Sequence, residues 1–192
     1  MFRHPCRCIF LFLILCPFNS FFVFLQVQRM LEQYDDAILA CEESILLARA
    51  CGYVAGVTRA QVVQCEILLG MVEKDEQNQS NADKEDHERD FKILTRIRAV
   101  GENLLETEKS KKKLKAGDIA RALFIVARIY MAIVIFAKAT ATQNDAALSK
   151  NITMEGIVAL LKESKEMFES ANDTSWIKQV VGFAQKHGVQ LE

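Results

Sequence analysis

From Gln28 to the end of the sequence the chain contains no proline, and its apolar residues recur every three or four positions. Proline inside a helix removes a backbone hydrogen bond and clashes with the preceding turn, so its absence leaves long helices unbroken. A spacing of three or four places apolar side chains on one face of an α-helix, whereas a half-buried strand would need alternation. Residues 28–192 are therefore predicted to be all-α, with antiparallel helix hairpins.

Six helices are predicted from this spacing and from the residues that start and stop helices. Asp118 and Thr153 have short polar side chains that can cap a helix N-terminus, as has either Asp173 or Thr174. Gly188 is expected to end the last helix. The predicted ranges are 28–50, 58–72, 86–114, 118–139, 154–170 and a helix that begins near 174.

The predicted helix 118–139 is apolar on nearly every side, which is typical of a buried central helix. A membrane-spanning helix is the alternative. Arg121 and Arg128 argue against it, because each would cost about 2.5–3.5 kcal/mol in the middle of a bilayer. The longest run without a charge in this helix is Ile129–Ala137, which is much shorter than the roughly 20 residues that a span needs.

Residues 74–90 are polar and contain no large apolar side chain. Such a stretch has nothing to bury, so it is expected to be either an exposed loop or the solvated start of a helix. It follows the second predicted helix, 58–72, and overlaps the start of the third, 86–114. We therefore treat 74–90 as a polar insertion in the helical domain.

Residues 1–27 differ in composition from the rest of the chain. Seven of the 12 phenylalanines and both prolines lie in the first 24 residues, and Cys8–Leu25 carries no charge. Because Arg3 and Arg7 precede this run, it is typical of a secretory signal or a membrane anchor. Two other interpretations stay open, a buried apolar helix hairpin and a stretch foreign to the natural domain. The chain divides accordingly into an apolar N-terminal segment and a helical repeat domain, 28–192.

The location of the protein depends on the same N-terminal segment. If residues 1–27 are not a targeting signal, we expect a cytoplasmic protein, in which a buried cysteine such as Cys41 stays reduced. If they are, the protein belongs to a membrane or the secretory pathway. Asn78 would then be the best glycan acceptor, because its sequon lies in the polar stretch.

The helical domain contains an internal similarity. Residues 35–70 and 154–188 share one organisation, a helix, a small polar turn and a second helix that ends at glycine. A second feature is a pattern of two large residues, a small one and an aromatic one, with spacings of three, one and three positions. It is formed by Leu123, Val126, Ala127 and Tyr130. In these features the chain resembles the tetratricopeptide repeat over 34–72 and 118–188, although it lacks the proline that usually closes the second helix. The resemblance implies a short α-solenoid of stacked hairpins, with a helical bundle as the alternative.

Arg121 and Arg128 are two turns apart, so they fall on one side of their helix. In the tetratricopeptide family the concave face holds peptides. The resemblance therefore implies a partner groove that contains Arg121, Phe124, Arg128 and Met131. Arginine there would suit an acidic or carboxylate-bearing partner. An alternative is that each arginine pairs with a neighbouring glutamate or reaches solvent.

No motif for catalysis, cofactor binding or metal binding is found in the sequence. The cysteines form no C-x-x-C pair, and the few histidines lie in polar surroundings. The basic run 109–115 has no interleaved aromatic residue for base stacking, so a nucleic-acid partner is not expected.

We therefore expect a non-enzymatic interaction or scaffold module with a protein or peptide partner. A membrane-anchored or secreted helical protein, targeted by 1–27, is the alternative. Neither the partner nor the oligomeric state follows from the sequence.

Overall fold

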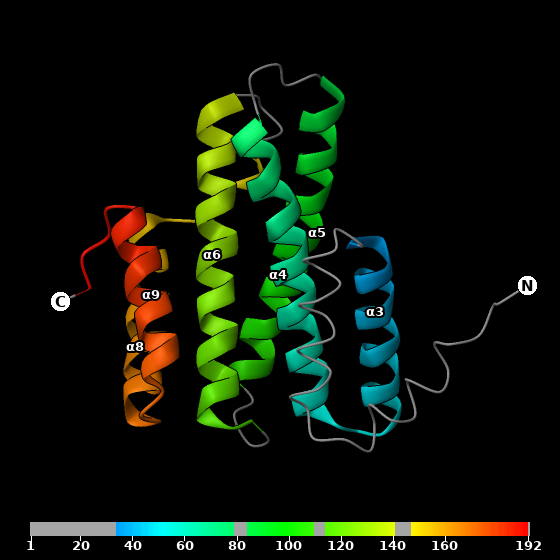
Figure 1. Cartoon of the computed structure of the whole chain (residues 1–192), viewed down its shortest axis with the longest axis vertical. Helices are drawn as coiled ribbons and strands as arrows, with labels where there is room; N and C mark the ends of the chain where they lie inside the picture. The colour runs from blue at the N-terminus through cyan, green and yellow to red at the C-terminus, as the bar shows by residue number, and fades with distance from the viewer. Residues whose placement is uncertain (1–33, 79–83, 110–113, 141–146, 192) are drawn as a thin grey trace, which may run out of the picture.

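Six α-helices make up most of the computed structural model, which describes residues 34–78, 84–109, 114–140 and 147–191. No strand occurs within these ranges, so the predicted all-α class is confirmed. The helices stand side by side along the long axis (Figure 1). The predicted N-terminal segment, 1–27, lies outside the described residues. The helices are α3 (Tyr34–Ala50), α4 (Val54–Asn78), α5 (Lys84–Lys109), α6 (Ala116–Thr140), α8 (Met154–Ser170) and α9 (Thr174–Lys186).

α3 packs on α4 through the apolar stripe that its sequence predicts. Ala37 and Cys41 are fully buried in a small cluster between the two helices. Gly52 then turns the chain into α4 with a φ of 64°, a left-handed conformation that glycine adopts without steric cost. The first predicted helix is confirmed over 34–50, and its first residues, 28–33, lie outside the described part.

The polar stretch 74–90 is helical wherever the structure describes it. α4 continues to Asn78, and α5 already begins at Lys84. The solvated start of a helix is thus the alternative that holds for 84–90, where α5 begins, whereas a loop is wrong for 74–78. The physical reason is that Lys, Glu and Gln have high helix propensity, so a polar run continues a helix whose neighbouring turns are packed.

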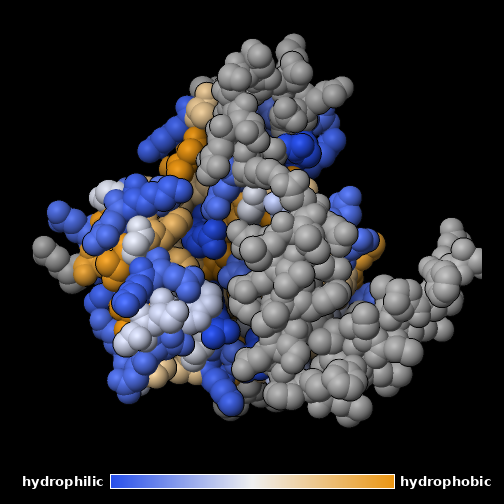
Figure 2. Space-filling view, in the orientation of Figure 1, coloured by the Kyte–Doolittle hydropathy of each residue, from blue (hydrophilic) through white to orange (hydrophobic). Residues whose placement is uncertain are grey.

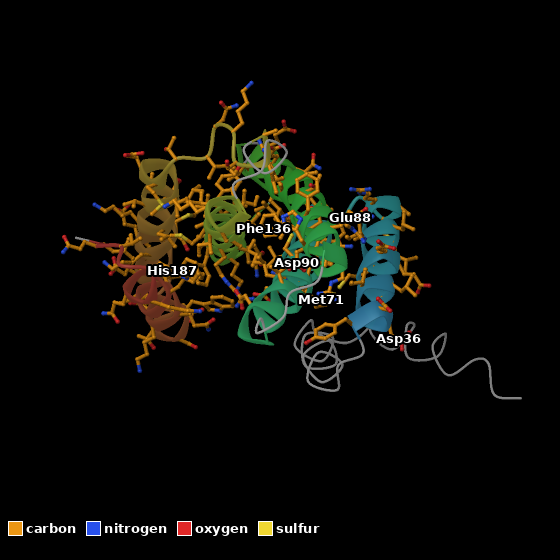
Figure 3. The ribbon with its side chains drawn as sticks, turned by 90° about the horizontal axis from the view of Figure 1, so that it is seen from above. Asp36, Met71, Glu88, Asp90, Phe136 and His187 are labelled. Atoms are coloured by element: carbon orange, nitrogen blue, oxygen red, sulfur yellow. The ribbon has the colours of Figure 1, made fainter. Side chains whose placement is uncertain are left out.

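α6 is the central helix of the molecule. It packs against α4 and α5 on one side and against α8 on another. Ile125, Ile129 and Ile133 belong to the core that it shares with α4 and α5. Phe124 and Ala127 belong to a second core, shared with α8 and α9. Seen from above, α6 lies between the α8–α9 pair and the other helices, with α3 outermost (Figure 3). The prediction of a buried central helix is therefore confirmed.

By length and composition alone, α6 is also the one helix of the described part that could cross a membrane. Within its most apolar 18-residue window, 67% of the residues are buried inside the chain. The core helix of a folded domain passes the same test, because both environments select apolar side chains. The burial of α6 against three neighbouring helices accounts for its composition.

Two polar contacts tie α6 to its neighbours. Arg59 on α4 donates from Nε and Nη2 to the two carboxylate oxygens of Asp118, at 2.7 and 2.8 Å. Ser164 on α8 donates to the carbonyl of Ala120 at 2.8 Å. Asp118 was predicted as an N-cap, which is wrong, because α6 begins two residues earlier at Ala116. Its carboxylate still lies in the first turn, where the helix dipole favours a negative charge.

The N-termini of α8 and α9 follow the sequence prediction closely. The Thr153 hydroxyl accepts a hydrogen bond from the Gly156 amide, and the Asp173 carboxylate accepts one from the Trp176 amide. These caps satisfy backbone donors that the first helical turn leaves without partners. Both helix starts are thus confirmed.

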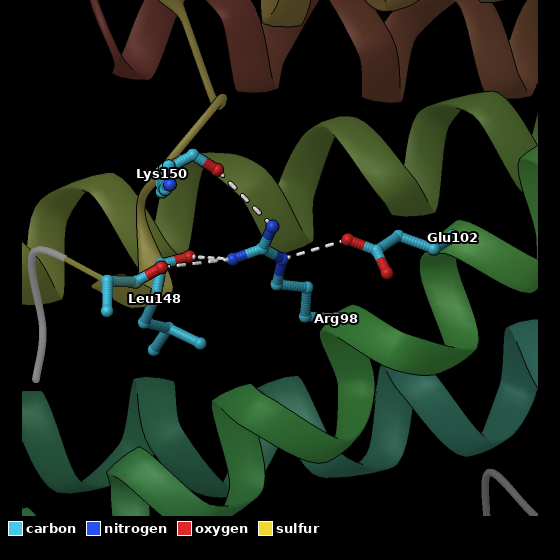
Figure 4. A network of polar contacts seen from close by, with 5 residues as sticks. Arg98, Glu102, Leu148 and Lys150 are labelled. Atoms are coloured by element: carbon cyan, nitrogen blue, oxygen red, sulfur yellow. Dashed lines mark hydrogen bonds and ion pairs between the residues drawn. The ribbon is translucent and has the colours of Figure 1, made fainter.

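Arg98 on α5 holds the turn that leads into α8 (Figure 4). Its Nε donates to Glu102 at 2.9 Å, and its Nη2 donates to the carbonyl of Lys150 at 3.3 Å. Nη1 donates to the carbonyl of Leu148. One guanidinium thus donates hydrogen bonds to two backbone carbonyls of this turn, which is not part of a regular helix. This contact connects α5 with the start of the α8–α9 pair.

Candidate functional site

Arg121 and Arg128 project from the side of α6 that lies between α4 and α9. Arg121 contacts α9 and Arg128 contacts α4. We call this surface the arginine face and define it by Arg121, Arg128, Glu73 of α4, and Trp176 and His187 of α9. In Figure 2 strongly hydrophilic and apolar surface lie next to each other in the strip of α6 visible beside α9. The face therefore combines positive charge with apolar surroundings.

The guanidinium group of Arg121 lies over an aromatic ring. Its guanidinium carbon is 4.8 Å from the centroid of the Trp176 ring. The Nε atom of Arg121 is buried and finds no hydrogen-bond acceptor among the described residues. Burial without an acceptor costs free energy, since the N–H has lost water and gained no partner. The stacked guanidinium is thus held in place with unused donor capacity.

Arg128 is paired within the chain. Its Nη2 donates to Oε1 of Glu73 at 2.9 Å, and its guanidinium carbon is 6.0 Å from the centroid of the Phe124 ring. The Arg128 side chain is 17% exposed and that of Glu73 is 40% exposed. The pair therefore lies at the surface, where an ion pair of this kind contributes only about 0–1 kcal/mol.

Phe124 and Met131 lie beneath the arginine face. They are 5% and 4% exposed and belong to the core that α6 shares with α8 and α9. The Phe124 ring meets the rings of Trp176 and Phe183 edge-on, with centroids 6.2 and 5.8 Å apart. Of the four residues predicted for a partner groove, the two arginines therefore reach the surface and the other two support it. Their role in binding a partner stays a prediction.

His187 borders the arginine face at the end of α9 (Figure 3). Its ring packs on Phe183, with centroids 4.5 Å apart. Burial lowers the pKa of His187 below its ordinary value of 6.5, as do the charges of Lys186 and Arg128, and Glu73 opposes the shift. The folded protein therefore disfavours the charged imidazole.

This shift predicts a pH dependence of stability. A histidine with a lowered pKa binds fewer protons in the folded state than in the unfolded chain, so the free energy of unfolding should fall as the pH drops below about 6.5. Urea unfolding at pH 7.5 and at pH 5.5 measures this. In His187→Gln the part of the slope due to His187 should disappear, while the exposed-site control Gln185→Ala should keep it. An unchanged slope in His187→Gln would contradict the assignment.

Two of the three cysteines in the described part are buried thiols. Cys41 and Cys65 are buried, and burial raises the pKa of both thiols, to about 12 for Cys41. They are therefore protonated near neutral pH, whereas a nucleophile must be a thiolate. Cys51 is exposed in the turn after α3. No group of three or more histidine, cysteine or acidic side chains suited to a metal ion occurs within the described ranges.

Three residues of the arginine face were not expected from the sequence. Glu73, Trp176 and His187 are separated from Arg121 or Arg128 by about 50 residues or more along the chain. No local spacing relates them, so sequence periodicity alone could not bring them together. For Trp176 the sequence did contain a signal of a binding surface. It is the single tryptophan of the chain, and large aromatic residues are frequent in binding surfaces.

Compared with protein-family models, with curated proteins and with solved structures, the chain matches none of them.

Proposed function

We propose that the protein is a non-enzymatic protein-interaction module of tetratricopeptide-like helix hairpins. It binds an acidic segment of a partner protein on the arginine face. The observation that carries this proposal is the stacked guanidinium of Arg121, with a buried N–H that finds no acceptor in the described part of the chain.

The order of helix contacts supports a stack of hairpins. α3 packs on α4, α5 on α6, and α8 on α9. The first pair meets the second through α4, and the second meets the third through contacts of α6 with α8. Each hairpin thus contacts the next one along the chain, as repeats do in an α-solenoid. Side chains of two different hairpins then border α6 and form a composite surface.

The chemistry of Arg121 favours a carboxylate as ligand. A planar guanidinium presents parallel N–H donors that match the two oxygens of Asp, Glu or a chain terminus. The contact with the Trp176 ring restricts the movement of the Arg121 side chain and so reduces the entropy that binding would cost. A bound carboxylate would also satisfy the buried Nε of Arg121. We therefore expect acidic peptides to bind better than their amide analogues.

Arg128 provides the second positive charge of the site. Its present partner, Glu73, is partly exposed and can turn toward water. A second acidic side chain of the ligand would then replace Glu73 as the acceptor. Two arginines that are two helical turns apart are about 10 Å apart along the helix axis, and a short acidic peptide can span this distance.

Trp176 gives the experiment a built-in reporter, because it is the single tryptophan of the chain and lies against Arg121. We would titrate the full-length protein with a set of Asp- and Glu-rich octapeptides and follow Trp176 fluorescence. The controls are the same peptides with Asn and Gln in place of the acids. The expected result is saturable binding of acidic peptides only. Equal binding of acidic and amide peptides would contradict the proposal.

Variants assign the binding to the arginine face. Arg121→Gln and Arg128→Glu should each weaken the binding by about 10–100-fold, because a hydrogen bond to a charged group contributes about 1.5–3 kcal/mol. Lys178→Glu is the matched control, since it reverses a charge on the exposed side of α9 near Trp176. If Lys178→Glu weakened binding as much as Arg128→Glu, general electrostatic attraction would explain the result. Unaltered binding in Arg128→Glu would show that the peptide does not bind on the arginine face.

A further inference from the structure

His187 is the titratable group at one end of the arginine face. It follows Trp176 by 11 residues, so α9 places the two side chains about 16 Å apart along its axis. Trp176 contacts Arg121. His187 instead lies where the charges of Arg128 and Glu73 act on it. The face therefore has a histidine close to its second arginine.

The His187 imidazole rests on aromatic rings that continue beneath Arg128. Its ring packs on Phe183, with centroids 4.5 Å apart. Phe183 meets Phe124 edge-on at 5.8 Å, and the guanidinium of Arg128 is 6.0 Å from the Phe124 ring. Such edge-on pairs hold large side chains in defined positions. His187 and Arg128 thus share one aromatic support.

Charged groups of the described part act on this imidazole from each element packed against it. They are Glu73 of α4, Arg128 of α6 and Lys186 of its own helix. Burial and the two cations lower the pKa of His187, and Glu73 opposes them. Histidine is the side chain whose ordinary pKa places its change of charge between pH 5 and 8. His187 is therefore mainly neutral at pH 7.5 and gains charge as the pH falls.

We infer that His187 couples the binding of the acidic partner segment to the uptake of a proton, so that the arginine face binds this segment more tightly as the pH falls from 7.5 to 5.5. The inference rests on the proposed function, since it concerns the ligand of the same surface. At pH 7.5 the face carries two arginines against one glutamate. Protonation of His187 adds a third cation at the end where Arg128 lies.

Two contributions of the imidazolium act in the same direction. It attracts the carboxylates of the ligand, and both of its ring nitrogens become donors. It also offers a second cation to Glu73, whose charge already acts on His187. Glu73 that turns from Arg128 toward His187 leaves the guanidinium of Arg128 available to the ligand. By linkage, a ligand that prefers the protonated protein takes up protons when it binds.

Titrations at several pH values test this coupling. We would add a Glu-rich octapeptide to the full-length protein at pH 5.5, 6.5 and 7.5, at constant ionic strength, and follow Trp176 fluorescence. Glutamate has an ordinary pKa of about 4.3, so the peptide stays ionised throughout. Calorimetric titration near pH 6, in two buffers with different enthalpies of ionisation, measures the protons that are taken up.

Three variants assign the effect to one side chain. His187→Gln removes the titrating group, and His187→Arg makes its charge permanent. His87→Gln is the matched control, because His87 is a second histidine of the described part and packs on Phe136, with ring centroids 4.8 Å apart. Circular dichroism checks that each variant keeps the helix content of the unchanged protein.

The unchanged protein should bind the peptide about 3–5-fold more tightly at pH 5.5 than at pH 7.5, which is the effect of one partly exposed ion pair, and it should take up protons. His187→Gln should bind with one affinity at every pH and take up none. His187→Arg should bind at pH 7.5 as tightly as the unchanged protein does at pH 5.5. His87→Gln should keep the pH dependence.

Two results would overturn the inference and leave the proposed function in place. One is an affinity of the unchanged protein that does not rise between pH 7.5 and 5.5. The other is a pH dependence that persists in His187→Gln. The absence of peptide binding at every pH would instead contradict the proposed function, and the inference with it.

Discussion

Replacing Phe168 by alanine should lower the free energy of unfolding by about 3–5 kcal/mol, the usual range for removing a fully buried aromatic side chain. Phe168 is 0% exposed and lies on α8 in the core shared by α6, α8 and α9. Its ring stacks on Trp176 with centroids 5.5 Å apart and planes 11° apart. The alanine variant loses these contacts and leaves a cavity that rigid neighbouring helices can only partly fill.

Urea unfolding of the full-length protein measures this loss, with helix content and Trp176 fluorescence as two probes. Phe168→Leu keeps most of the volume, so its cost should stay near 1–1.5 kcal/mol, as estimated for such exchanges in cores. Glu166→Ala changes an exposed residue of the same helix and should shift the stability by less than about 0.5 kcal/mol. A cost below about 1 kcal/mol for Phe168→Ala would mean that α8 and α9 do not form the core described above.

Asp118→Ala should cost about 2–3 kcal/mol, because it removes the two carboxylate oxygens that accept hydrogen bonds from Nε and Nη2 of Arg59. The Asp118 side chain is 6% exposed and that of Arg59 is 26% exposed. Removing one partner of a fully buried pair costs about 3–5 kcal/mol, and the water contact of Arg59 reduces this figure. The hydrogen bond to Asp118 raises the pKa of Arg59. Arginine stays protonated near neutral pH even without such a partner, so the charge of Arg59 persists in the variant.

A double-mutant cycle with Arg59→Gln separates the pair from other effects. The two changes together should cost clearly less than the sum of the single changes, because the second no longer breaks an intact pair. Lys165→Gln is the matched control, since it breaks an ion pair with Glu169 that lies within one helix at the surface. It should cost less than about 0.5 kcal/mol. Equal costs for Asp118→Ala and Lys165→Gln would contradict a structural role for the Arg59–Asp118 contact.

The helices could be predicted from the sequence because their signals are local. Thr153 and Asp173 cap α8 and α9 as expected, since a cap depends on residues within one turn. The ends of α4 and α5 were harder to predict. A polar run such as 74–90 lacks the apolar spacing that indicates a helix, although its side chains tolerate helical geometry.

The candidate site could be predicted only in part. Arg121 and Arg128 lie on one side of α6 because they are seven residues apart, and helix geometry alone places such residues on the same side. That Phe124 and Met131 lie beneath this side, covered by α8 and α9, depends on how the hairpins pack. The pairing of Arg128 with Glu73 and the stacking of Arg121 on Trp176 depend on the same packing.

By itself the sequence determined the all-α class, the capped starts of α8 and α9 and the burial of α6. Each of these follows from backbone hydrogen bonding and apolar periodicity within one segment. Only the tertiary structure decided that Asp118 binds Arg59 instead of capping its helix, that α4 and α9 border the two arginines, and that Leu39 and Leu46 of α3 stay exposed. Periodicity shows that a side of a helix prefers apolar contact, but which neighbour supplies that contact depends on how all the helix faces fit together.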